Sequence, residues 1–71
     1  MHVKRVAIET AGLILWKVLR DVINEGMEKD KLIAVMVGRG TSLELVMASL
    51  DEMQKIGKVY DFNGTLFALL N

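Results

Sequence analysis

The side chains that could carry out acid–base or nucleophilic chemistry are few and poorly spaced for it. Asp51 and Glu52 are neighbours on a predicted helix, so their carboxylates point about 100° apart and do not form an acid and base pair. Ser42 and Ser49 lack an activating histidine, because the one histidine of the chain is His2 at the terminus. We therefore expect a protein that is not an enzyme.

Metal and cofactor binding have equally little support. The absence of cysteine excludes disulfides and thiolate zinc sites, and His2 alone supplies no set of metal ligands. The glycine-containing run at residues 38–42, GRGTS, lacks the spacing of a phosphate loop and follows no predicted strand. We expect no cofactor, no metal and no small-molecule substrate.

Two large apolar residues suggest a different activity, which is contact with another protein. Leu13 and Trp16 project toward the polar side of the first predicted helix, near Arg20. Exposed tryptophan is enriched at binding hot spots, so these residues indicate a contact patch that Ile23 and Leu45 would extend. The alternative is that Trp16 belongs to the core, covered by the N-terminal segment or by a C-terminal hairpin.

A first amphipathic helix over residues 7–23 must position that patch. The sequence leaves two starting points for this helix. It begins near Val3, or it begins near Thr10 and residues 3–8 form a short strand or arm. Residues 1–9 are therefore either an arm or an extension of the helix. The predicted buried stripe follows three- and four-residue steps and consists of Ala7, Ile8, Ala11, Ile14, Leu15, Val18, Leu19 and Val22.

Glycines and capping residues divide the next part of the chain. Gly26 occupies the place of a left-handed cap after the first helix, and Gly12, at the edge of the buried stripe, permits another helix to approach closely. Asp30 is the predicted cap of a short second helix whose apolar face lies within residues 32–37. Residues 38–40 then interrupt the helical pattern.

A third helix is predicted from about residue 42 to residue 56. Thr41 and Ser42 are both good caps, and Thr41 with Glu44 matches a capping box, while Gly57 ends the helix. Its predicted core side consists of Val46, Leu50 and Met53, with Leu43 and Ile56 at the two edges.

The chain ends in a predicted β-hairpin. Segments 59–62 and 65–70 alternate with period two and flank Asn63-Gly64, the preferred dipeptide of a tight type I′ turn. The hairpin aromatics are expected to pack onto the first and third helices; they are Tyr60, Phe62 and Phe67.

This order of elements, with a motif at its centre, resembles the winged helix-turn-helix family. The family pattern G-[IVT]-S-x3-V-x3-L-x2-L-x3-G-x-[IV]-Y is matched by Gly40-Thr41-Ser42, Val46, Leu50, Met53, Gly57, Val59 and Tyr60. The likeness is close over residues 40–60 and looser over 13–70. It implies an α+β winged-helix fold, in one domain spanning residues 1–71, with the hairpin as the wing.

Within that family, residues 32–60, LIAVMVGRGTSLELVMASLDEMQKIGKVY, are most similar to the C-terminal winged-helix domain of archaeal minichromosome maintenance helicases. Modules of single-strand-binding protein subunits and of archaeal cell-division machinery share the pattern. The resemblance therefore implies a setting in DNA replication, transcription or division.

The resemblance also implies that the exposed side of the third helix enters the DNA major groove with Arg, Lys, Asn or Gln side chains. In this sequence that side carries Glu44, Ala48, Asp51, Glu52 and Lys55. Three carboxylates against one ammonium would repel the phosphates of DNA. The predicted hairpin turn contains no lysine or arginine either, so the family's DNA-contacting positions do not carry over.

We therefore expect a non-enzymatic module that docks to itself or to a protein of the DNA machinery. The predicted protein-binding residues are Leu13, Trp16, Arg20, Leu45, Glu44, Asp51 and Glu52. The alternative is a small dimeric DNA-binding transcriptional regulator, from an archaeon or an archaeal virus, and a third class is a structural subunit of a larger assembly. Candidate contacts to the DNA backbone are Lys4, Arg5, Lys31, Arg39 and Lys55.

Composition agrees with docking better than with DNA binding. Nine Lys and Arg balance nine Asp and Glu, whereas nucleic-acid modules usually carry a basic excess. Glu9 and Lys17 interrupt the apolar N-terminal run, so neither a signal peptide nor a membrane span is expected, and we predict a soluble, cytoplasmic protein. A 71-residue chain without disulfides or metal has a small core, so self-association is the remaining way to add stability to its fold.

Overall fold

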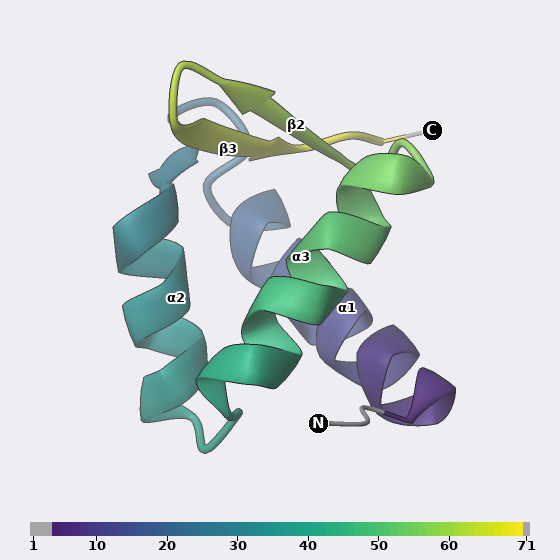
Figure 1. The fold of residues 1–71 in the computed structure, drawn as a ribbon. Helices are drawn as coiled ribbons and strands as arrows, with labels where there is room; N and C mark the ends of the chain where they lie inside the picture. The colour runs from purple at the N-terminus through teal and green to yellow at the C-terminus, as the bar shows by residue number, and fades with distance from the viewer. Residues whose placement is uncertain (1–3, 71) are drawn as a thin grey trace.

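The computed structural model describes residues 4–70, which form three helices and a three-stranded antiparallel sheet. The helices and strands are α1 (Arg5–Arg20), β1 (Met27–Glu28), α2 (Lys29–Gly38), α3 (Leu43–Lys55), β2 (Val59–Phe62) and β3 (Thr65–Ala68). In Figure 1, α1 crosses behind α3, α2 stands beside them, and the β2–β3 hairpin lies across one end of the helices. Three helices followed by a C-terminal hairpin confirm the predicted α+β, winged helix-turn-helix layout.

Helix α1 includes the segment whose structure the sequence left open. Residues 5–9 are helical and Lys4 is the N-cap. Of the two alternatives, an extension of the helix is therefore right for these residues, and a strand or arm is wrong. His2 and the start near Val3 lie outside the described residues. The predicted end at residue 23 is wrong.

The apolar pattern continues past α1 although the helix does not. After Arg20 three-residue backbone hydrogen bonds appear among the four-residue ones, as from the Val22 N–H to the Leu19 carbonyl at 3.1 Å. Half-buried Val22 and Ile23 thus sit in turns. Gly26, with φ of 72°, ends this segment in the expected left-handed conformation.

The start of α2 differs from the prediction. Glu28, not Asp30, is its N-cap, and no side chain caps the helix. Instead, the Lys29 N–H donates to the carbonyl of Gly64 at 3.0 Å, so the hairpin turn accepts from one of the first N–H groups of α2. Strand β1, which the sequence did not predict, immediately precedes the helix.

One of the two good caps before α3 does the capping. Ser42 is the N-cap and its Oγ accepts from the Leu45 N–H at 3.2 Å. The predicted capping box of Thr41 with Glu44 is therefore wrong, because the N-cap lies one residue later than Thr41. Helix α3 itself, Leu43–Lys55 with Ile56 as C-cap, confirms the predicted helix within one residue at each end.

The sheet has the order β1-β3-β2. Asn63 and Gly64 both have positive φ, 52° and 89°, as the predicted tight turn requires. The Asp61 carboxylate accepts from the Gly64 N–H at 2.8 Å and so braces the turn. Strand β3 ends at Ala68 instead of residue 70.

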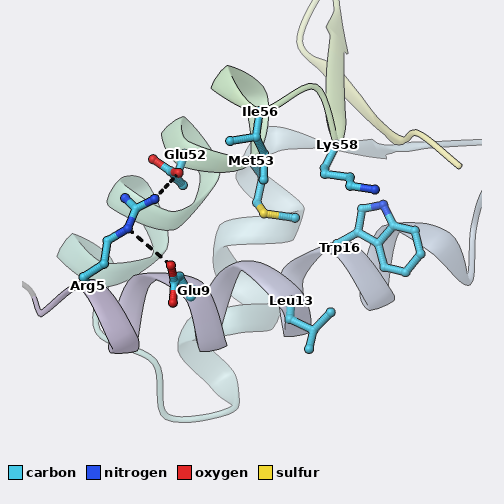
Figure 2. Close-up of a pocket in the computed structure, with 8 residues that line it drawn as sticks. All are labelled: Arg5, Glu9, Leu13, Trp16, Glu52, Met53, Ile56 and Lys58. Atoms are coloured by element: carbon cyan, nitrogen blue, oxygen red, sulfur yellow. Dashed lines mark hydrogen bonds and ion pairs between the residues drawn. The ribbon is translucent and has the colours of Figure 1, made fainter. Parts of the chain in front are cut away.

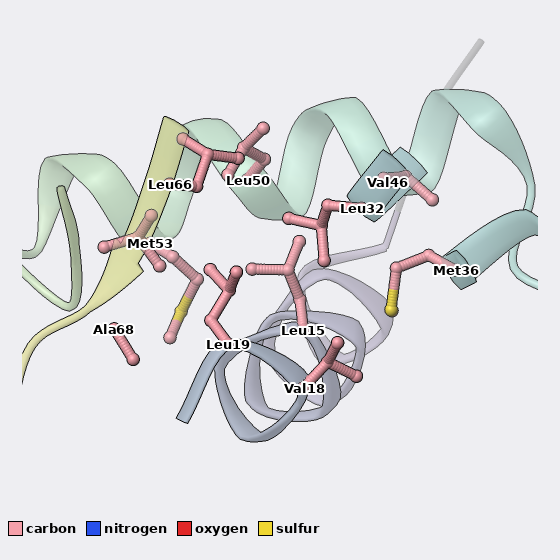
Figure 3. Packing of buried hydrophobic residues seen from close by; sticks show 11 residues of the cluster. Leu15, Val18, Leu19, Leu32, Met36, Val46, Leu50, Met53, Leu66 and Ala68 are labelled. Atoms are coloured by element: carbon pink, nitrogen blue, oxygen red, sulfur yellow. The ribbon is translucent and has the colours of Figure 1, made fainter. Parts of the chain in front are cut away.

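The core lies where α1, α2 and α3 meet beneath the sheet, and Figure 3 shows its side chains converging there. Leu15, Leu19 and Val46 are fully buried, as predicted, whereas Ile14 is 38% exposed and does not belong to the stripe. The buried apolar residues are Ala11, Leu15, Val18, Leu19, Leu32, Met36, Val46, Leu50, Met53, Val59, Leu66 and Ala68.

Close packing of α1 on α3 depends on small residues at the crossing. Gly12 is buried, and a Cβ placed on it would lie 2.9 Å from the sulfur of Met53, which is closer than side chains tolerate. Ser49 is fully buried on the facing side of α3 and donates its hydroxyl to the Val46 carbonyl. The prediction that Gly12 permits close approach of another helix is confirmed.

The three hairpin aromatics lie on the outer face of the sheet, opposite the face that carries Val59, Leu66 and Ala68, so the prediction that they pack onto the first and third helices is wrong. Tyr60 and Phe62 are 51% and 56% exposed and stack on each other with ring centroids 6.4 Å apart. The pleat turns Val59 inward, which places its neighbour Tyr60 and then Phe62 on the outer face. Only Phe67 is half-buried, with its ring against Gly26.

Candidate functional site

A groove of about 380 Å³ runs between α1 and the C-terminal half of α3, and it contains both residues of the predicted contact patch. Its walls combine apolar and charged side chains (Figure 2), namely Arg5, Glu9, Leu13, Trp16, Glu52, Met53, Ile56 and Lys58. Leu13 is 50% exposed and Ile56 is 56% exposed. The groove therefore offers apolar surface to a partner, and charges at its two ends.

Trp16 is shared between the groove and the core. Its indole N–H donates to the Leu69 carbonyl at 3.1 Å, just after β3, and its ring packs against the core. Arg20 lies over the same ring, with Cζ 5.4 Å from the centroid. The hairpin end covers one side of Trp16, so the alternative that the hairpin covers this residue is right in part, and its role in a contact patch stays a prediction.

One end of the groove is closed by an ion-pair network that joins α1 to α3. The Arg5 guanidinium donates to Glu52 at 2.5 Å and lies 3.4 Å from the Glu9 carboxylate. The hydrogen bond from Arg5, with its charge, holds the pKa of Glu52 below its usual value, against an opposing effect of desolvation. The same hydrogen bond, together with the negative charge of Glu52, raises the pKa of Arg5. The Glu52 carboxylate is thereby held in its charged form against α1.

The outer face of α3 differs from the face that the sequence predicted. Glu52 turns toward α1 and only 19% of its side chain is exposed, so it does not belong to the outer face. Asp51 and Lys55 pair with each other at 3.2 Å, one helical turn apart. Glu44 remains exposed, and the face carries one net negative charge where the sequence suggested two.

Apolar residues also reach the outer face of α3, which the sequence analysis missed. Leu43 is 56% exposed and Met47 is 41% exposed. Leu43 was expected at the edge of the core, and the exposure of both shows that the apolar stripe of α3 is narrower than its composition suggested. This face presents apolar and acidic groups together.

The remaining predicted residues do not gather into one site. Leu45 is half-buried in a separate shallow groove with Ala7 and Ile14, and not beside Leu13, while Ile23 packs against the core. The exposed candidates for DNA-backbone contact lie on different elements: Lys4 before α1, Lys31 on α2 and Arg39 after it, with Arg5 and Lys55 in ion pairs.

Within residues 4–70 no three or more His, Cys, Asp or Glu side chains come together as metal ligands. In the same residues no helix combines the length and the apolar composition that a membrane crossing requires. The groove itself combines an apolar surface, paired charges and an indole fixed by its own hydrogen bond. Comparisons with protein-family models, with curated proteins and with solved structures found no match to this chain.

Proposed function

We propose that this chain is a non-enzymatic winged-helix interaction module, which docks to a second copy of itself or to a protein of the DNA replication, transcription or division machinery. The observation that carries the proposal is the outer face of α3. It has one net negative charge and exposed Met47, with Gln54 as its single amide group, where a DNA-reading helix presents several basic and amide groups.

The groove between α1 and α3 supports the same proposal. Leu13 and Ile56 are each at least half exposed, and Trp16 beside them is held by a hydrogen bond that fixes its ring. Tryptophan and arginine are enriched in protein-binding hot spots, and here Arg20 lies over the Trp16 ring. The charged residues at the groove ends would orient a partner.

Fluorescence anisotropy with a labelled DNA duplex tests the proposal against direct DNA reading. We expect the wild-type chain to bind duplex DNA with a dissociation constant weaker than about 100 µM at about 50 mM salt. Binding below about 1 µM that weakens steeply toward about 200 mM salt would contradict the proposal.

A charge-reversal pair shows whether the α3 face is responsible. In the Glu44→Lys/Asp51→Lys variant, the two carboxylates of that face become ammonium groups, and we expect DNA affinity to rise at least about tenfold. The matched control is Asp21→Lys/Glu25→Lys, which changes the net charge equally at exposed positions away from α3. An equal gain in both variants would show that net charge alone, and not the α3 face, governs DNA binding.

The alternative function, a small dimeric DNA-binding regulator, is favoured by one observation. Lys31 and Arg39 are exposed and make no ion pair with the residues that the structure describes. If they contact phosphates, the Lys31→Ala/Arg39→Ala variant weakens any DNA binding uniformly across sequences and lowers its salt dependence. An unchanged affinity would remove this alternative.

A further inference from the structure

The outer side of α1 carries a stripe of exposed residues that no other element of the described chain covers. Val6 is 72% exposed and Leu13 is 50% exposed. Figure 2 shows Leu13 on the side of α1 farther from α3, at the rim of the groove that it lines. The two apolar side chains lie in line along one face of the helix, so they offer a narrow contact surface for a second helix.

The charges along the stripe are arranged symmetrically about Leu13. Glu9 lies four residues before Leu13 and Lys17 lies four residues after it, so the two have opposite charge at equal distance. Val6 and Arg20 are likewise seven residues before and after Leu13. The stripe is therefore complementary to itself when a second copy is turned end for end.

We propose that the occupant is a second copy of this chain, with the two α1 helices packed antiparallel and a two-fold axis passing beside Leu13. The inference rests on the proposed docking function and specifies the partner. In this arrangement the two Leu13 side chains meet at the axis, as an isologous contact requires. Glu9 of each copy faces Lys17 of the other, and Val6 lies against the aliphatic part of Arg20.

The ion pairs within a single chain leave Glu9 and Lys17 able to form this pairing. Lys17 is exposed and has no carboxylate within ion-pair distance among residues 4–70. The Glu9 side chain is 62% exposed and contacts only one nitrogen of Arg5, at 3.4 Å, which leaves its other oxygen for a second cation. Two symmetric ion pairs can thus form without breaking a contact of the single chain.

The expected dimer is weak. A single helix pair buries less than the roughly 1,200 Å² of a standard stable interface, so we expect a dissociation constant on the order of 10–100 µM. Sedimentation equilibrium of the full chain across this concentration range at low salt measures it directly. Leu13→Glu is expected to give a folded monomer throughout, with the circular dichroism spectrum of the wild type.

Charge reversal tests the antiparallel register. Glu9→Lys places an ammonium group opposite Lys17 of the second copy, and Lys17→Glu places two carboxylates opposite each other, so each variant alone should dimerise at least about tenfold more weakly. The double variant Glu9→Lys/Lys17→Glu restores opposite charges and should dimerise like the wild type. Lys17→Glu leaves the Arg5–Glu9 pair intact, so its effect is not an indirect effect on that pair.

Mixing the two single variants gives the most specific result. Glu9→Lys with Lys17→Glu forms two favourable pairs across the interface, and we expect a one-to-one heterodimer from two weakly associating chains. The control mixture is Glu9→Lys with Lys55→Glu, which has the same net charges but places the reversal on α3. In that mixture the Lys55→Glu chain should form its own homodimer, as the wild type does. Little heterodimer should form, because the ammonium group introduced at position 9 of one chain would face Lys17 of the other.

Three results would each overturn the antiparallel dimer. They are a wild-type chain that stays monomeric across the range, single reversals that dimerise normally, and as much heterodimer in the control mixture as in the mixture of the two reversals. The results that would contradict this dimer are distinct from those that would contradict the proposed docking function. If Leu13→Glu prevents association while the reversals have no effect, the docking surface stands and the register is wrong. Tight, salt-dependent binding to duplex DNA is what would refute the docking function.

Discussion

The outer faces of α1 and α3 both mix charged and apolar residues, yet they differ in where their charges find partners. On α3, Asp51 pairs with Lys55 on the same helix, and this pair is complete within the chain. On α1, Leu13 is exposed and Lys17 has no carboxylate partner among the described residues. The comparison teaches that composition alone does not describe the charge of a face, because Asp51 and Lys55 neutralise each other on α3 while Lys17 on α1 has no such partner within residues 4–70.

The largest effect should come from removing the core on which both faces depend. Leu15 is fully buried on α1 while Leu13, two residues earlier, is half exposed. Leu15→Ala should lower the free energy of unfolding by about 2–5 kcal/mol through lost burial and a cavity. Leu13→Ala should change it by less than about 0.5 kcal/mol. Urea unfolding of both variants at low protein concentration checks this, and equal losses would show that Leu13 is part of the core.

Gly12 sets the distance between the two helices. Gly12→Val should cost about 1–3 kcal/mol, because the added methyl groups would overlap Met53 at the α1–α3 crossing. The control is Gly38→Ala at the end of α2, where an added Cβ meets nothing within 4 Å. Thermal unfolding followed by circular dichroism compares the two. A wild-type midpoint for Gly12→Val would mean that the helices separate without cost.

The Trp16 indole links the outer end of α1 to the hairpin. Trp16→Phe removes the hydrogen bond to the Leu69 carbonyl, and we expect a loss of about 0.5–1.5 kcal/mol in urea unfolding. Tyr60→Phe, which removes a hydroxyl from a ring that is 51% exposed, is the matched control and should change little. If both substitutions had the same small effect, the indole hydrogen bond would contribute nothing measurable to the free energy of unfolding.

The smallest effect concerns the ion pair between the two helices and depends on pH. Because the pKa of Glu52 is lowered in the folded chain, the pair stabilises the fold above the usual glutamate pKa of about 4.3 and is lost as pH falls through the lower folded value. Arg5→Gln should therefore lower the midpoint of thermal unfolding near neutral pH and have a smaller effect in acid. Arg39→Gln is the control, and a pH-independent difference for Arg5→Gln would contradict this assignment.

Much of the fold follows from short-range patterns in the sequence. The three-helix order, the buried residues Leu15 and Leu19, and the Asn63-Gly64 turn were all predictable, because each depends on spacing within one element or on the φ of one turn. Strand β1 was not, since its two residues become a strand only by pairing with β3. The cap of α2 was missed for the same reason, since its partner is the distant carbonyl of Gly64.

The candidate site was predictable in part. Leu13 and Trp16 could be selected because their helical positions disagree with their polarity. The Arg5–Glu52 pair joins residues 47 positions apart, and no local pattern indicates a contact of that kind. It altered the charge of the α3 face, which shows how one long-range contact changes an electrostatic argument drawn from helical spacing.

Trp16 has a practical consequence, because it is the one tryptophan of the chain. Its indole touches the hairpin end, Arg20 and the groove at once. The intrinsic emission of the unlabelled protein therefore comes from a single position at which three parts of the molecule meet. A shift in its wavelength would reveal the release of the hairpin from α1 even while the helices stay intact, with no dye or tag attached.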